Sequence, residues 1–166
     1  MSENFKQRLH RVKAFVFDID GVLTNGIVRV HSDNTTSRTI HSKDFQAITH
    51  AAKHGYVLAV ISSSKADAIK ETLLRFGMNE VYLRSTDKEI TFKEFTAVYG
   101  LEDDEVLFMG DDIPDLLAMR RCGVPCCPYD AAPEIREMCV YVSPKKGGEG
   151  CVRDVIEQVM RLQGKW

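Results

Sequence analysis

Two carboxylates stand two residues apart where a short apolar run ends, in the segment Phe15-Val-Phe-Asp18-Ile-Asp20-Gly-Val-Leu-Thr24. The run has the composition of a buried strand, and carboxylates are uncommon at such positions. A close acid pair is also unfavourable unless a cation or a proton holds the two groups together. The segment therefore predicts a strand that delivers Asp18 and Asp20 to a loop where they take part in chemistry.

A second acidic cluster follows another apolar run. The run Val-Leu-Phe-Met at 106–109 leads directly into Gly-Asp-Asp-Ile-Pro-Asp at 110–115. Two parallel strands that both end in carboxylates concentrate negative charge in one crevice, which a hard cation such as Mg²⁺ stabilises. Asp111 stands at the strand end. Asp112 and Asp115 also fit a second interpretation, as acidic residues favoured at a helix N-terminus.

Hydroxyl groups and a lysine add to the acidic residues. The strand-like run 57–61 ends in a serine triplet at 62–64, which offers hydroxyls and backbone N–H groups to an anion. Capping of the next helix by a serine is the alternative interpretation. Lys88 opens a helical segment, where its charge opposes the helix dipole, so its position favours a role in binding a negative ligand.

The elements that must position these residues alternate along the chain. Strand-like runs are predicted at 14–17, 57–61, 80–83, 106–109, 124–126 and near residue 140. Helical periodicity is found at 45–53, 66–76, 89–99, 114–121 and 151–162. Continuous apolar strands separated by helices predict a three-layer α/β fold with a doubly wound parallel sheet, in a single domain over 1–166.

One segment departs from this alternation. Residues 26–41 contain two short alternating runs around a polar Ser-Asp-Asn turn, which predicts a β-hairpin directly after the first acidic loop. Ligands of open α/β sheets bind beyond the carboxyl ends of the strands, so the hairpin would flank the site as a flap. A purely structural hairpin is the alternative.

The composition excludes several classes of protein. The 166 residues are 44% apolar and 28% charged with a formal net charge of −2, as in an ordinary globular protein, and they offer no general electrostatic reason to bind nucleic acid or a membrane. We find neither an apolar stretch long enough to span a bilayer nor a signal peptide, and the five cysteines suggest a reducing compartment, so a cytoplasmic location is expected. The adjacent Cys126 and Cys127 fit buried thiols better than a zinc site.

The order of these motifs resembles that of the haloacid dehalogenase superfamily of phosphohydrolases. The segment 18–24 is similar to its first motif, Ser62 to its second, Lys88 to its third and the segment 110–115 to its fourth. The resemblance covers essentially the whole chain and implies a Rossmann-like fold. Between these motifs the sequence leaves no room for the cap domain that most members carry. The predicted hairpin is the only insertion left in that place.

Two features narrow the resemblance to a capless subgroup. The first is the absence of a cap, and the second is the Gly-rich segment 145–150. Both resemble features of the subgroup that contains 3-deoxy-D-manno-octulosonate 8-phosphate phosphatase and related phosphatases of 2-keto-3-deoxy sugar acids. This resemblance implies a homotetramer in which a neighbouring subunit covers each site and the Gly-rich segment helps to cover it. A flexible loop before the last helix is the alternative interpretation of that segment.

The resemblance also implies a mechanism. Asp18 would attack phosphorus and form an aspartyl phosphate, which divides one difficult displacement into two easier ones. Mg²⁺ would be held by Asp18, the backbone carbonyl of Asp20 and Asp111, while Lys88 and the Ser62 hydroxyl bind phosphoryl oxygens. Asp20 would protonate the leaving sugar oxygen and later activate water. Asp112 and Asp115 would lie behind these groups and orient the metal and Lys88.

Substrate contacts are expected from Asn25, Lys43, Ser63 and Ser64. Members that act on octulosonate 8-phosphate usually carry Thr-Gly-Arg where this chain has Ser62-Ser63-Ser64, and those that act on nine-carbon sugar acids carry Thr-Gly-Glu. The segment 42–45 resembles an Arg-Asp-Gly motif with Lys43 in place of arginine, which could meet a sugar carboxylate as a point charge. The phosphate of a nononate or an N-acylneuraminate is therefore an alternative substrate.

Two other functions share part of the pattern. A non-catalytic tetramerisation module would have the same fold, but loss of the acid pair would be expected in it, and the pair is present here. A receiver domain phosphorylated on aspartate shares the acidic strand ends and a lysine. The spacing of Asp18 and Asp20 and the hairpin both argue against a receiver domain.

Overall fold

A six-stranded parallel sheet forms the centre of the computed structural model, which describes residues 4–166. The strands are β1 (Ala14–Phe17), β4 (Val57–Ile61), β5 (Glu80–Tyr82), β6 (Val106–Met109), β7 (Val124–Cys127) and β8 (Tyr141–Val142). Their order across the sheet is β5-β4-β1-β6-β7-β8, and every pairing is parallel. The doubly wound α/β sheet expected from the sequence is therefore confirmed.

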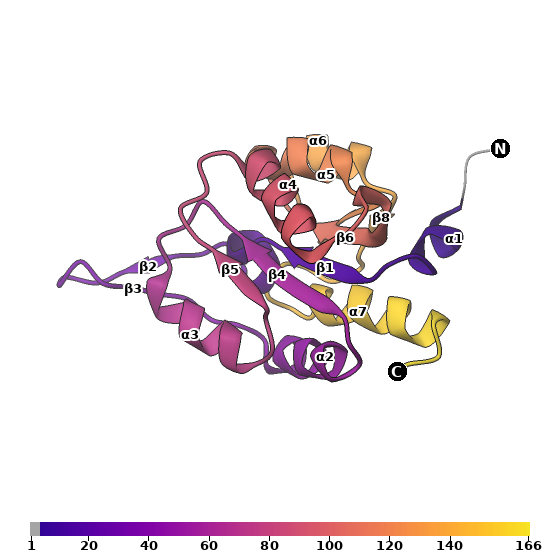
Figure 1. Ribbon diagram of the computed structural model, residues 1–166. Helices are drawn as coiled ribbons and strands as arrows, with labels where there is room; N and C mark the ends of the chain where they lie inside the picture. The colour runs from indigo at the N-terminus through magenta and orange to yellow at the C-terminus, as the bar shows by residue number, and fades with distance from the viewer. Residues whose placement is uncertain (1–3) are drawn as a thin grey trace.

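Helices cover both faces of the sheet (Figure 1). One face carries α4 (Lys88–Tyr99), α5 (Leu116–Arg121) and α6 (Pro133–Met138), and the other carries α1 (Phe5–Leu9), α2 (Ser42–Lys53), α3 (Asp67–Arg75) and α7 (Cys151–Leu162). Three short helical turns lie in loops: η1 (Ile19–Leu23), η2 (Asp103–Glu105) and η3 (Ile113–Asp115). The molecule thus has three layers.

The central strand β1 shows why its sequence reads as an unbroken apolar run. Phe15 and Phe17 pack into the core beneath α2 and α7, whereas Ala14 and Val16 pack into the core beneath α4 and α5. All four side chains are fully buried. Side chains of a strand alternate between faces, so a strand covered on both sides has to be apolar throughout.

Helix boundaries account for most of the differences from the prediction. The helix expected at 45–53 begins at Ser42, because His41 provides its N-cap by accepting from the amide of Lys43. Helices α1 and α6 were not predicted. They have five and six residues, too few to show a clear helical period.

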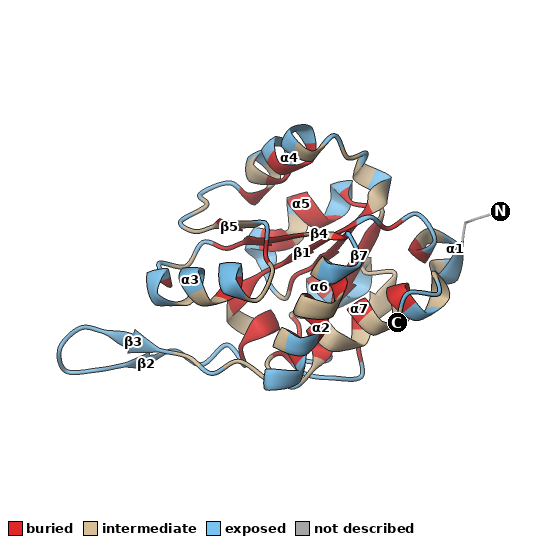
Figure 2. Cartoon of the chain, turned by 60° about the horizontal axis from the view of Figure 1, so that its bottom comes forward, coloured by how far each residue is buried: buried red, intermediate tan, exposed pale blue. Residues whose placement is uncertain are grey.

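The hairpin expected at 26–41 is present but short. Its strands β2 (Arg29–Val30) and β3 (Thr36–Ser37) pair with each other in an antiparallel two-stranded sheet. The hairpin projects from the body, and its residues are mostly exposed (Figure 2). It extends from the end of the molecule opposite to α1 and the C-terminus (Figure 1).

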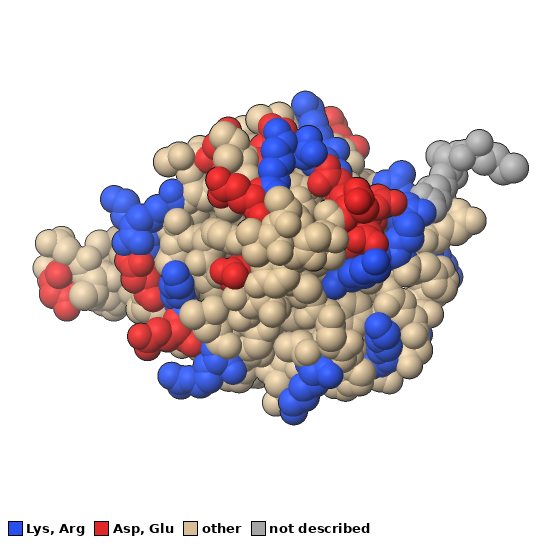
Figure 3. Space-filling model, in the orientation of Figure 1, with Lys and Arg blue, Asp and Glu red and all other residues tan. Residues whose placement is uncertain are grey.

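The surface carries charges of both signs. On the face seen in Figure 3, basic and acidic side chains are interspersed and form no extended field of one sign. Over residues 4–166, helices that combine the length and the apolar character needed to cross a membrane are absent.

Asp44 joins the two helices that cover one face of the sheet. It lies in the first turn of α2, fully buried, and its Oδ1 accepts the backbone N–H of Arg153 in α7 at 2.8 Å. Its Oδ2 has no hydrogen-bond partner among the described residues. Burial raises the pKa of Asp44 to about 6, against the opposing effect of the Arg153 amide.

The variant Asp44→Asn is expected to become more stable relative to the wild type as the pH rises. Because the folded pKa near 6 exceeds the ordinary value, this carboxyl stabilises the fold most below about pH 4, and that contribution is lost as the pH rises through about 6. Above that pH the buried charge costs the wild type about 3 kcal/mol. Asparagine keeps an oxygen for the Arg153 amide and carries no charge.

Urea unfolding of both proteins at about pH 4.5 and about pH 8 measures this effect. Asp33→Asn is the control: hydrogen bonds from Thr35 lower the pKa of this exposed hairpin carboxyl, so its contribution is lost only below about pH 4 and its stability difference from the wild type should not change between these two pH values. A stability difference between wild type and Asp44→Asn that does not change with pH would contradict the assignment.

Candidate active site

The carboxyl ends of β1, β4 and β6 meet at one edge of the sheet. In the strand order, β1 lies between β4 and β6. The strands β4 and β5 are therefore added on one side of β1, and β6, β7 and β8 on the other. Such a switch point leaves a crevice beyond the strand ends, where ligands of open α/β sheets bind. The crevice here is a pocket of about 470 Å³. Its lining includes Asp18, Asp20, Arg38, Lys88, Asp111, Asp112 and the serines at 62–64.

The loop after β1 holds Asp18 in place. Its Oδ1 accepts the backbone N–H of Ile19 at 2.7 Å, and the backbone N–H of Asp18 donates to Met109 at the end of β6. The turn that follows needs Gly21, whose φ is +86°. A Cβ at Gly21 would lie 1.9 Å from Oδ2 of Asp111, so a side chain there would displace this carboxylate.

Lys88 connects the two acidic segments. Its ammonium group contacts Oδ2 of Asp18 at 2.8 Å and Oδ1 of Asp115 at 2.6 Å, and all three side chains are buried. Lys88 is the first residue of α4, which is capped by Asp87, and this position directs the side chain back toward the strand ends. The charge that opposes the helix dipole is thus balanced by two carboxylates.

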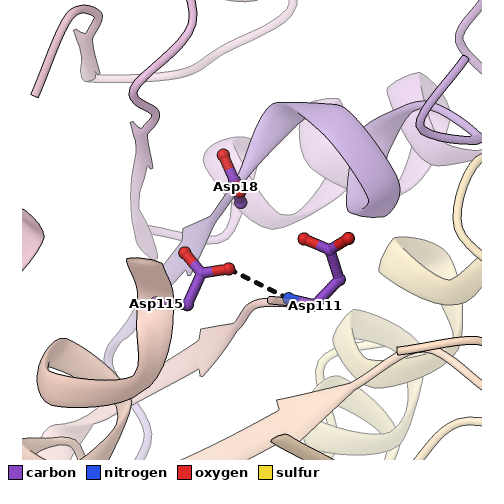
Figure 4. A group of neighbouring side chains, drawn as sticks. All are labelled: Asp18, Asp111 and Asp115. Atoms are coloured by element: carbon purple, nitrogen blue, oxygen red, sulfur yellow. Dashed lines mark hydrogen bonds between the residues drawn. The ribbon is translucent and has the colours of Figure 1, made fainter. Parts of the chain in front are cut away.

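Three carboxylates lie close enough together to share one cation. Asp18, Asp111 and Asp115 each have an oxygen within 4.8 Å of the others (Figure 4). Both oxygens of Asp115 are already engaged, Oδ1 with Lys88 and Oδ2 with the backbone N–H groups of Asp111 and Asp112 at 3.0 and 3.3 Å. Asp18 and Asp111 are therefore the better candidates for ligands, and Asp115 holds the loop and Lys88.

The electrostatics of the cluster show an excess of negative charge. Burial, followed by the charges of Asp18 and Asp115, raises the pKa of Asp111 to about 8. Burial and the charge of Asp115 also raise the pKa of Asp18, while Lys88 lowers it. Burial lowers the pKa of Lys88, but Asp18 and Asp115 outweigh it and the net shift is upward. A divalent cation beside Asp18 and Asp111 would relieve this repulsion.

The serine triplet lines the pocket without capping a helix. The N-cap of α3 is Ala66, so the capping interpretation is excluded. The Ser62 hydroxyl is almost fully buried and accepts the backbone N–H of Ser64 at 3.2 Å. All three serines belong to the lining of the pocket, where hydroxyl and backbone N–H groups could meet an anion.

Sequence reasoning missed Arg38. The residue follows β3, and its guanidinium contacts the carboxylate of Asp20 and, at 3.0 Å, the hydroxyl of Ser64. A guanidinium from the hairpin therefore contacts the last residue of the serine triplet. The signal available in the sequence was a pair of arginines, at 29 and 38, in a hairpin that directly follows an acidic loop.

Three of the predicted residues lie at the margin of this arrangement or outside it. Lys43 is exposed and lines another pocket, together with Lys145 and Arg153. Asn25 is exposed and accepts the backbone N–H of Ile27, which begins the hairpin. The third, Asp112, lines the pocket and accepts the backbone N–H of Ile113.

The Gly-rich segment packs behind the acidic loop of its own chain. The backbone N–H of Gly148 donates to Val22 at 3.0 Å, and the backbone N–H of Gly147 donates to Asp130 at 2.9 Å. A Cβ on Gly147 would lie 2.0 Å from the carbonyl oxygen of Gly21. These glycines therefore permit a close approach that supports the acidic loop.

Comparisons with known proteins find relatives that match nearly the whole chain. No protein-family model matches the chain. The curated 3-deoxy-D-manno-octulosonate 8-phosphate phosphatase KdsC of Escherichia coli strain K12 is 25% identical over 158 residues, which cover 95% of this chain and 84% of that protein. The crystal structure of a probable YrbI family phosphatase from Pseudomonas syringae has a TM-score of 0.94 and 31% identity, with 96% of this chain and 91% of that chain covered.

A second solved structure carries ligands. It is the 3-deoxy-D-manno-octulosonate 8-phosphate phosphatase of Moraxella catarrhalis in complex with a magnesium ion, a phosphate ion and a KDO molecule. It has a TM-score of 0.93 and 26% identity, with 96% of this chain and 91% of that chain covered. The agreement in fold and sequence extends over nearly the full length of each protein. The chain is therefore a phosphatase and belongs to the YrbI family of the haloacid dehalogenase superfamily.

Proposed function

We propose that this phosphatase is a Mg²⁺-dependent phosphomonoester hydrolase that acts on a 2-keto-3-deoxy sugar acid phosphate, such as 3-deoxy-D-manno-octulosonate 8-phosphate, through an aspartyl phosphate on Asp18. The observation that carries the proposal is the buried ion pair of Asp18 and Lys88 beside Asp111 at the switch point of the sheet. The names of the relatives supply the substrate class.

The acidic residues fit a divalent cation. Hard cations prefer carboxylate and carbonyl oxygens, and burial together with the charges of Asp18 and Asp115 raises the pKa of Asp111, which a nearby cation would lower. Asp18, Asp111 and the backbone carbonyl of Asp20 are the groups that would hold the ion. When bound, Mg²⁺ would neutralise charge on the phosphoryl group and on the attacking carboxylate.

The first step follows from the position of Asp18. An oxygen of its carboxylate attacks phosphorus, the P–O bond to the sugar breaks, and the sugar oxygen leaves. Lys88 holds Oδ2 at 2.8 Å and thereby fixes the carboxylate for this attack. Lys88 and the Ser62 hydroxyl then donate hydrogen bonds to the phosphoryl oxygens, whose charge they stabilise.

Asp20 supplies and removes the protons. In the first step its carboxyl gives a proton to the leaving sugar oxygen. In the second step it takes a proton from the water that attacks phosphorus, the P–O bond to Asp18 breaks, and phosphate is released. Asp20 lines the pocket from the same loop as Asp18, as both tasks require.

The substrate contacts divide between the pocket and a neighbouring chain. Ser63 and Ser64 line the pocket, whereas Lys43 lies in another pocket of the same chain. We place a contact between Lys43 and the sugar carboxylate across two copies of a homotetramer, in which Asn25 and the exposed Ile27 and Val30 of the hairpin lie near the neighbour. Sedimentation velocity tests the assembly, because a monomer at the assay concentration would exclude this contact.

A panel of phosphorylated sugar acids tests the function. Initial rates of phosphate release with Mg²⁺ and with EDTA are compared for octulosonate 8-phosphate, a nononate 9-phosphate, an N-acylneuraminate 9-phosphate and neutral sugar phosphates. We expect Mg²⁺-dependent turnover that is fastest on the octulosonate. Faster turnover of the nine-carbon acids would favour the alternative substrates, and no turnover on any ester would reject the proposal.

Gly21→Ala is expected to lose about 10²-fold in kcat/KM on the best substrate of this panel, because the new methyl group displaces the carboxylate of Asp111. Gly55→Ala is the matched control. Its φ is +83°, and a Cβ there meets no atom within 4 Å. Both variants should lose about 1–2 kcal/mol of stability from the left-handed backbone. Equal activity of the two variants would show that Asp111 does not need its present position.

A further inference from the structure

Arg38 is a hairpin residue with a side chain that is not directed to solvent. It follows β3, where Thr36 and Ser37 are exposed, yet its own side chain is only 12% exposed. The guanidinium turns from the hairpin toward the pocket that holds the acidic loop. A long cationic side chain loses rotamer freedom when it is held in this way, so its contacts must compensate for that loss.

Two of these contacts hold the carboxylate of Asp20. Nε of Arg38 donates to Oδ1 at 2.7 Å, and Nη2 donates to Oδ2 at 3.2 Å. A paired contact of this kind fixes the plane and the direction of a carboxylate as well as its position. The hydroxyl of Thr24 also donates to Oδ1, at 3.3 Å.

The guanidinium is itself fixed from two other segments. Nη2 donates to the hydroxyl of Ser64 after β4 at 3.0 Å, and Nη1 donates to the hydroxyl of Thr36 in β3 at 3.1 Å. Arg38 therefore joins the acidic loop, the loop after β4 and the hairpin. The two strands of the hairpin pair with each other, and the contacts of Arg38 connect the hairpin to the pocket.

We infer that Arg38 is a positioning residue for proton transfer: it fixes the direction of the Asp20 carboxyl and couples that direction to the placement of the hairpin. The inference rests on the proposed function, in which Asp20 exchanges protons with the leaving oxygen and with water. A proton donor must lie within hydrogen-bond reach of the atom that it protonates. A carboxyl free to rotate about its side-chain bonds meets that condition less often.

Esters with different leaving groups separate this role from a structural one. An alkyl phosphate needs a proton on its leaving oxygen, whereas p-nitrophenyl phosphate releases a stable phenolate and needs little help. The ratio kcat/KM reports the steps up to release of the alcohol. We therefore compare kcat/KM for the best sugar phosphate and for p-nitrophenyl phosphate in the wild type, Arg38→Met, Arg38→Lys, Asp20→Asn and the double variant Asp20→Asn/Arg38→Met.

Arg38→Met should lower kcat/KM for the sugar phosphate by about 10- to 100-fold, and for the aryl phosphate by less than about threefold. On the aryl phosphate, kcat and KM should fall together, because water attack on the phosphorylated protein becomes slow. Arg38→Lys should recover part of the loss, since an ammonium makes a single contact where the guanidinium makes two. In the Asp20→Asn background, Arg38→Met should have little further effect.

Arg29→Met is the matched control, because it removes an exposed arginine from the other strand of the hairpin. It should leave kcat/KM unchanged for both esters. Equal losses on both esters in Arg38→Met, or a full additional loss in the double variant, would overturn the inference while the proposed function stands. A wild type that hydrolyses neither ester with Mg²⁺ would reject the proposed function, and the inference with it.

Discussion

Asp18→Asn should abolish turnover and leave the protein folded. The amide cannot attack phosphorus as a carboxylate does, so we expect kcat to fall by about 10⁴-fold or more. Because burial and the charge of Asp115 raise the pKa of Asp18, its ionised form is unfavourable in the metal-free protein. The neutral amide should therefore be tolerated because Lys88 keeps its contact with Asp115, and thermal unfolding in EDTA at neutral pH should show no loss of stability.

The matched control is Asp67→Asn, which removes an exposed carboxylate that pairs with Arg84 on the surface. It should retain full activity. A variant Asp18→Asn that is folded and still turns over substrate would show that another group attacks phosphorus.

Lys88→Met should impair both stability and activity. The ammonium lies between the carboxylates of Asp18 and Asp115, and its removal leaves two buried acids without a cationic partner. Loss of one member of a buried ion pair costs about 3–5 kcal/mol. Loss of a group that binds phosphoryl oxygens should lower kcat by about 10²- to 10³-fold. Urea unfolding in EDTA and initial rates in Mg²⁺ measure the two effects.

Lys93→Met, on the same helix, is the matched control. Lys93 is half exposed and pairs with Glu89 one turn earlier, a contact worth at most about 1 kcal/mol. If the two variants unfold at the same urea concentration, the buried cluster does not depend on Lys88 as its geometry indicates.

The sheet and the acidic cluster were predictable because local sequence determines them. Strands buried on both faces are apolar throughout, so an aspartate marks the place where such a strand ends. Asp18 and Asp111 follow two strands that are neighbours in the sheet, and their approach follows from parallel pairing alone. In the sequence, Lys88 was recognisable as a cation at a helix N-terminus, where the helix dipole disfavours positive charge. In the structure, two carboxylates balance that charge.

The contacts that escaped prediction depend on tertiary placement. Arg38 meets Asp20 across 18 positions of sequence, and hairpin strands of two residues carry too little pattern to give the direction of a side chain. Lys43 was expected at the substrate, but α2 begins before it and places it in another pocket of its own chain, so the proposed contact with the sugar carboxylate needs a neighbouring copy. Because α2 begins at Ser42, Asp44 lies in its first turn and is buried in the core, where it accepts a backbone N–H of α7.

The glycines at 147 and 148 show the same limit. Their sequence is compatible with a mobile loop, yet a Cβ at either position would collide with the backbone of the acidic loop. Only the packed structure shows that they are small because another segment lies against them. Side-chain volume is then set by a neighbour more than 100 residues away in sequence.

The proposed mechanism requires a covalent phosphate on Asp18, and a rapid-quench experiment detects it. Asp20→Asn is mixed with Mg²⁺ and radiolabelled p-nitrophenyl phosphate, quenched in acid and digested, and the labelled peptide is identified by mass spectrometry. The aryl group leaves without a proton, while water attack is slow without Asp20, so the intermediate should accumulate. We predict label on Asp18. Label on another residue, or unlabelled protein from a variant that still releases p-nitrophenol, would contradict an aspartyl phosphate on Asp18.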